Sequence, residues 1–144
     1  MSAFPKWFAQ LQWSRPWPVA ELAIQRHRLP VSSGCYVFTD DDVGLRPDHV
    51  LYVGKAKVLR NRVGGYLVDY KKTVPTKHKG RAYIFERREA IGDQRVHVRW
   101  VEYGGNPGQL EANLCDFLWP ACTDRWETHE LWNDDETIDP RLIW

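Results

Sequence analysis

Cysteine is scarce in this 144-residue sequence, and its spacing argues against two kinds of small protein. Cys35, Cys115 and Cys122 cannot all pair with one another, and none of them forms a CxxC motif. We therefore expect neither a disulfide scaffold nor a structural zinc site. A reduced, cytoplasmic protein is the simplest interpretation.

Long apolar runs are missing as well. No stretch of about 18 consecutive apolar residues occurs, so a transmembrane helix and a membrane partner are not expected. The first residues lack the basic region and apolar run of a secretory signal. With 43% apolar and 27% charged residues, the chain can still build one sizeable core. Its length is that of about one domain.

The signatures of several common enzyme classes are absent. The sequence has no histidine pair at metal-ligand spacing, no GxSxG motif and no phosphate loop ending in Gly-Lys-Ser/Thr. Its five histidines are scattered, and each alone is more typical of a surface or core residue than of a ligand. Zinc peptidases, α/β-hydrolases and P-loop enzymes are therefore not indicated.

The net charge of +1 conceals an uneven distribution. Residues 55–99 hold 13 of the 20 lysines and arginines but only four of the 19 acidic residues. A basic segment between acidic flanks is typical of a surface that binds a polyanion such as nucleic acid. An ordinary solvated surface, with the acidic flanks folded back onto it, remains the alternative.

Apolar periodicity predicts helices and strands in the order α-α-β-β-α-α-β-α. We expect a small α/β (α+β) domain whose three-stranded, mostly antiparallel sheet is flanked by helices. The first two strands should form an antiparallel hairpin, because only an extended loop separates them. The expected helices are 4–13, 19–28, 58–66, 76–90 and 107–118, and the expected strands are 34–38, 50–53 and 95–101.

Two short motifs in the hairpin carry the clearest functional signal. Gly34-Cys35-Tyr36 is followed by Leu51-Tyr52-Val53-Gly54-Lys55-Ala56-Lys57, and Leu110-Glu111-Ala112-Asn113-Leu114 comes much later. Together these blocks resemble the GIY-YIG nuclease superfamily, and they are especially similar to the incision domain of bacterial excision-repair nucleases. The resemblance covers about residues 29–123 and implies one GIY-YIG domain over 1–144, with an N-terminal helical extension (1–28) and an irregular acidic C-terminal extension (124–144).

The resemblance also implies roles for individual residues. Tyr36 would activate the attacking water with Tyr52 assisting, and a cation such as Lys55 or the metal would favour the phenolate. Arg62 would clamp the scissile phosphate, and Tyr66 would lie on the same face of the helix. Glu111 would hold Mg²⁺, which suits a single carboxylate, or Mn²⁺ in its place. The expected nucleic-acid-binding residues are Gly54, Lys57, Arg60, Lys71, Lys72, Lys77 and Lys79.

The sequence departs from the family pattern at three places. Cys35 replaces a β-branched residue and is expected to be a core substitution. The loop 39–49 is longer than in the repair nucleases, and its role is open. The Asn that often follows the Pro closing the last helix is missing after Pro120.

The resemblance predicts a divalent-metal-dependent DNA endonuclease, but it leaves alternatives open. One is a catalytically weak nucleic-acid-binding module of the same fold. Another is a toxin or effector nuclease with an immunity partner. A homodimer or a targeting partner is possible, and RNA is not excluded as substrate.

Overall fold

The computed structural model describes residues 5–41, 44–45, 49–72 and 78–122. It contains the strands β1 (Trp17–Pro18), β2 (Gly34–Thr39), β3 (Val50–Ala56) and β4 (His97–Glu102). The helices are α1 (Lys6–Ala9), α2 (Val19–Ala23), the 3₁₀ helix η1 (Arg26–Arg28), α3 (Leu59–Gly64), α4 (Lys79–Ile91) and α5 (Pro107–Leu118).

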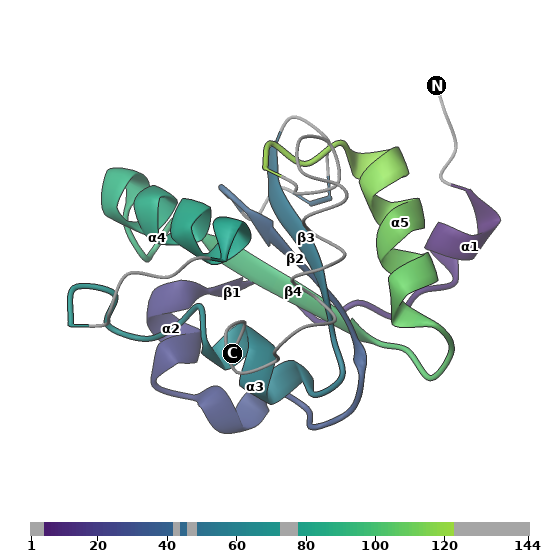
Figure 1. Cartoon of the computed structure of the whole chain (residues 1–144), viewed down its shortest axis with the longest axis horizontal. Coiled ribbons are helices and arrows are strands. Elements are labelled where there is room, and N and C mark those ends of the chain that lie inside the picture. The colour runs from purple at the N-terminus through teal and green to yellow at the C-terminus, as the bar shows by residue number, and fades with distance from the viewer. Residues whose placement is uncertain (1–4, 42–43, 46–48, 73–77, 123–144) are drawn as a thin grey trace.

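The strands form one antiparallel sheet in the order β1-β4-β2-β3 (Figure 1). The expected mixed α/β fold and the antiparallel hairpin are confirmed. The predicted count of three strands is wrong, because the two-residue strand β1 adds a fourth at the edge beside β4. Pro18 is tolerated there because an edge strand need not donate every backbone N–H.

Helices cover both faces of the sheet, as Figure 1 shows. Tyr36 and Phe38 of β2 point into one core cluster, with Leu22 of α2, Leu59 of α3 and Ile84 of α4. Cys35 and Val37 point the other way, into a second cluster beneath α1 and α5. This alternation follows from the two-residue period of a strand. It also confirms Cys35 as a fully buried core residue.

Three helices end earlier than expected. The helix predicted over 4–13 ends at Ala9. The helix predicted from Val19 to about Arg28 ends at Ala23 and is followed by η1. The helix predicted to reach Tyr66 ends at Gly64, and the chain continues in a turn in which Tyr66 N–H donates to the Val63 carbonyl. Tyr66 is therefore not on a helical face shared with Arg62, and the next subsection shows what holds it in place.

The last two helices have clear start signals. The side chain of His78 caps α4, and the side chain of Asn106 caps α5 ahead of Pro107. Helix α5 ends at Leu118, and the residue that follows, Trp119, has a positive φ of 51°, which is unusual for a residue other than glycine. The predicted acidic C-terminal extension lies outside the described residues.

None of the helices within the described ranges has the length and apolar character needed to span a membrane.

Candidate active site

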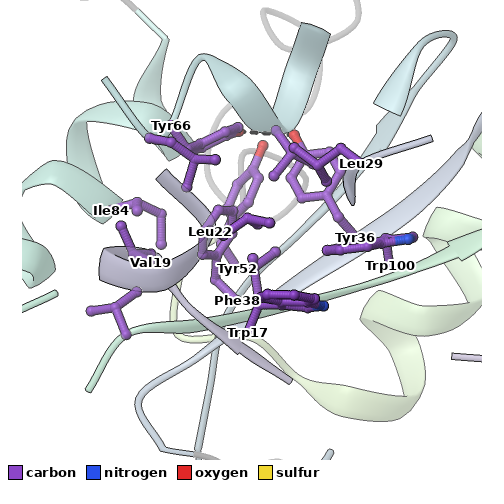
Figure 2. Packing of buried hydrophobic residues seen from close by; sticks show 14 of the residues in the cluster. Trp17, Val19, Leu22, Leu29, Tyr36, Phe38, Tyr52, Tyr66, Ile84 and Trp100 are labelled. Atoms are coloured by element: carbon purple, nitrogen blue, oxygen red, sulfur yellow. Dashed lines mark hydrogen bonds between the residues drawn. The ribbon is translucent and has the colours of Figure 1, made fainter. Parts of the chain in front are cut away.

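Three tyrosines from three elements meet on the face of the sheet that α2, α3 and α4 cover. Tyr36 is on β2, Tyr52 is on β3 and Tyr66 follows α3, and each is at most 1% exposed. Their ring centroids lie 5.5–6.4 Å apart. The Tyr36 and Tyr66 hydroxyls share a hydrogen bond of 2.9 Å, and Figure 2 shows the Tyr52 hydroxyl turned toward the same place. The predicted pairing of Tyr36 with Tyr52 is therefore confirmed, and Tyr66 joins it.

Two glycines make room for these rings. A Cβ at Gly54, directly across the ladder from Tyr36, would lie 2.3 Å from the Tyr36 Cζ and Oη atoms. A Cβ at Gly80 in α4 would lie 2.4 Å from the Tyr52 ring. Such distances are far inside van der Waals contact, so both positions require glycine for packing. Close approach of the Gly54 backbone to a phosphate stays a prediction.

Arg62 brings a positive charge to the tyrosines. It projects from α3 and is 5% exposed. Burial alone would lower the pKa of Arg62, but the phenols of Tyr36 and Tyr66 raise it. Burial also raises the pKa of Tyr36, and the Arg62 charge together with hydrogen bonds from Tyr66 and Arg62 opposes that rise. In this structure the charge of Arg62 favours the Tyr36 phenolate, and a contribution from Lys55 or a metal ion stays a prediction.

Glu111 and Lys55 both act electrostatically on Cys35, which points to the opposite face of the sheet from Tyr36. Burial first and the Glu111 charge next raise the pKa of the Cys35 thiol, whereas Lys55 lowers it. Glu111 is 3% exposed and also raises the pKa of Tyr36, so it is within electrostatic reach of the tyrosines. Lys55 Nζ lies 3.3 Å from the Cβ position of Gly108, in the first turn of α5. The start of α5 thus places a carboxylate beside the hairpin.

Tyr66 is held in its turn by an arginine of the basic segment. Arg88 on α4 donates to the carbonyl of Tyr66 at 2.9 Å and to that of Val68 at 2.8 Å. The same guanidinium is paired with Asp93 through two bonds of 2.8 and 2.9 Å. Being 6% exposed, Arg88 has a structural role, which sequence clustering alone did not distinguish from binding.

His78 is a member of the cluster that the sequence did not indicate. Its ring centroid lies 6.3 Å from those of Tyr52 and Tyr66, edge to face with both. Its Nδ1 accepts a hydrogen bond of 3.1 Å from the Arg81 backbone N–H. The one available signal was its place just before a helical pattern, because histidine is not among the preferred capping residues. The sequence alone therefore indicates an ordinary surface or core histidine at this position.

The predicted nucleic-acid-binding residues differ in exposure and in the contacts that they make. Lys57, Lys71 and Lys72 are exposed, and Lys79 is the first residue of α4. Arg60 donates to the carbonyls of Leu29 and His27, at 2.9 and 3.2 Å, and so ties α3 to the segment around η1. Lys77 lies outside the described residues. Binding by any of these residues stays a prediction.

Glu111 is a buried single carboxylate, which is a type of ligand that Mg²⁺ accepts, and metal binding at this residue stays a prediction. Within the described ranges, no group of three or more His, Cys, Asp or Glu side chains is placed to hold a metal ion. A buried single carboxylate leaves the remaining coordination positions to water and to substrate phosphate. Mg²⁺ accepts that arrangement, whereas structural zinc requires four protein ligands.

Comparison with known proteins agrees with this geometry. Residues 32–87 match the family model of the UvrC-like GIY-YIG domain, a stretch that contains the hairpin, Arg62, Tyr66 and His78 but not Glu111. The UvrABC system protein C of Prochlorococcus marinus subsp. pastoris is 47% identical over 47 residues, which are 33% of this chain and 6% of that protein. Its counterpart in P. marinus strain MIT 9312 is 45% identical over 47 residues, again 6% of its length.

No solved structure gave a significant match. The family model nevertheless covers the part of the chain in which the fold places the paired tyrosines and the buried arginine. Residues 32–87 are therefore similar to the UvrC-like GIY-YIG domain found in bacterial excision-repair nucleases, and the chain spans only a small part of the length of the curated relatives that it matches.

Proposed function

We propose that this protein is a divalent-metal-dependent DNA endonuclease that hydrolyses phosphodiester bonds. The observation that supports the proposal most directly is the buried cluster in which the hydrogen-bonded hydroxyls of Tyr36 and Tyr66 face the Arg62 guanidinium. Burying the Arg62 guanidinium beside phenols costs free energy of folding, because removing a charge from water is unfavourable. A functional role for the guanidinium accounts for its burial despite this cost. The cluster provides a proton acceptor and a phosphate clamp in one place.

In the proposed reaction, a water molecule attacks phosphorus and the bond to one ester oxygen breaks. Tyr36 accepts the proton of the water, and Tyr52 orients that water from the neighbouring strand. Arg62 favours the Tyr36 phenolate before the step and stabilises the charge that develops on the phosphate oxygens during it. Tyr66 keeps the Tyr36 hydroxyl in position through their hydrogen bond.

Glu111 is the residue that would hold the metal ion. A bound Mg²⁺ or Mn²⁺ supplies positive charge to the phosphate and its leaving oxygen. Lys55 adds a further positive charge at the start of α5, where a nucleic-acid backbone can approach. Exposed lysines of the 55–99 segment provide sequence-independent attraction for that backbone.

Plasmid nicking tests this proposal. Supercoiled plasmid is incubated with wild type, with Glu111→Ala and with the isosteric Glu111→Gln, in Mg²⁺ and in chelator. Wild type should nick the plasmid only with the metal, and both variants should lose nicking while retaining DNA binding. Wild-type nicking in chelator, or full activity of both variants, would contradict the proposal.

The same experiment separates the proposal from a binding module that lacks chemistry. A module would bind plasmid and leave it uncut at every metal concentration. Circular dichroism of each variant serves as the folding control, because Glu111 is buried and its replacement can disturb packing.

A further inference from the structure

The first turn of α4 packs directly against the tyrosine cluster. Gly80 has no side chain because the Tyr52 ring occupies the space, and the ring of His78 lies against Tyr52 and Tyr66. Backbone and side-chain contacts therefore fix this turn relative to the site. Arg81 follows Gly80 directly, and its backbone N–H is bonded to His78, so its backbone has a fixed position beside the tyrosines.

His78 fixes this turn as an uncharged group. Since its Nδ1 accepts the Arg81 N–H bond, the ring proton is on Nε2. Burial, followed by the charges of Arg62 and Arg81, lowers the pKa of His78 to about 3. The imidazole therefore stays neutral at physiological pH and acts as a cap rather than as a general base.

Arg81 brings a second guanidinium to the site. Burial lowers the pKa of Arg81 and repulsion from Arg62 lowers it further, while Tyr66 and Tyr36 act in the opposite direction. Arg62 on α3 and Arg81 on α4 thus place two like charges around the same phenols. An anion bound between them would relieve their repulsion and accept bidentate hydrogen bonds.

We propose that Arg81 binds the backbone phosphate next to the scissile one, alongside Arg62, and that His78 is the positioning residue that holds Arg81 there. The inference rests on the proposed nuclease function, since it assigns a neighbouring phosphate to the same site. The enzyme would then bind two adjacent backbone phosphates at once, which favours a polynucleotide over a single phosphoester as substrate.

Salt titration of DNA binding tests this inference. Binding of a fluorescein-labelled duplex is followed by anisotropy in chelator, so that no cleavage occurs. Arg81→Gln should weaken binding about 10- to 100-fold, the usual range for a lost charged hydrogen bond. The slope of log affinity against log salt should become shallower by about 0.9, as expected for one lost phosphate contact.

Arg15→Gln is the matched control. It removes the same charge beside β1, at the sheet edge opposite β3, where Arg15 forms an exposed pair with Glu21. Its slope should equal that of wild type. If Arg81→Gln also has the wild-type slope, the inference about Arg81 is overturned. Failure of wild type to nick plasmid in Mg²⁺ would instead overturn the proposed function.

Two variants test the positioning role of His78. Asn is a good N-cap that can accept the Arg81 N–H, so His78→Asn should retain the wild-type salt slope. His78→Ala removes the cap and should make the slope as shallow as that of Arg81→Gln. Equal slopes for wild type and His78→Ala, in protein that melts cooperatively, would overturn the positioning role.

Discussion

Gly54 lies directly opposite Tyr36 in the β2–β3 ladder, and the phenol ring of Tyr36 occupies the space that a Cβ at position 54 would need. The glycine of the second motif and the tyrosine of the first are therefore two halves of one packing contact. Neither motif explains this contact when it is read alone.

Gly54→Ala should destabilise the protein and displace the Tyr36 ring. Overpacking of a core site costs about 1–3 kcal/mol, which denaturant unfolding would measure. The cost should nearly vanish when Tyr36→Ala removes the ring, so the two substitutions should be strongly non-additive. Additive effects would mean that the glycine is required for its backbone rather than for this ring.

The cleavage rate should rise steadily with pH. Burial keeps the pKa of Tyr36 above its ordinary value of 10.0, so the phenolate fraction grows about tenfold per pH unit below that value. Single-turnover cleavage between pH 6 and pH 9 should therefore show a slope near one and no plateau. Tyr36→Phe should abolish this dependence, and an unchanged slope in that variant would assign the proton acceptor to another group.

Arg62→Ala should lower turnover by about 10²–10³, by analogy with the loss of one donor to a developing oxyanion. Stability should change much less, because the substitution also removes the cost of burying a charge. Thermal melting must accompany the kinetics. A large drop in melting temperature with little loss of turnover would show that Arg62 is structural.

The stability of the protein should fall below neutral pH because of His78. Its folded pKa of about 3 lies below the ordinary histidine pKa of 6.5, so the unfolded chain binds a proton that the folded protein does not. Unfolding therefore becomes easier as pH falls below about 6.5. Between pH 7 and pH 5, protonation of His78 in the unfolded chain lowers the free energy of unfolding by about 2 kcal/mol. The pH dependence of denaturant unfolding should be weaker in His78→Asn by that amount.

Lys71 and Lys72 should contribute to the attraction of DNA. Both are exposed in the turn before α4, so their reversal to Glu leaves the core intact. If both contact phosphates, the salt slope of binding should become shallower by about 1–2 in the double variant, on every sequence tested. A slope equal to that of wild type would show that these lysines face away from the DNA.

Several parts of this protein were determined by the sequence alone. The β-rich run Gly34-Cys35-Tyr36-Val37-Phe38 predicted a strand, and Asn106-Pro107 marked the start of α5. These signals are local, since strand periodicity and helix capping depend on residues a few positions apart. The two tyrosine motifs identified the hairpin for the same reason.

Other features were decided only by tertiary structure. The short strand β1 exists because β4 offers an edge for pairing, and the helix predicted through Tyr66 ends early while Arg88, 22 residues away, holds the carbonyl of Tyr66. His78 and Gly80 were ambiguous in the sequence because their partners, Tyr52 and Tyr66, lie on other elements. Contacts between distant segments depend on how the helices and strands pack, and local sequence propensity does not predict that packing. The sequence therefore identified the tyrosines and the arginine, and the fold decided which of them share one buried site.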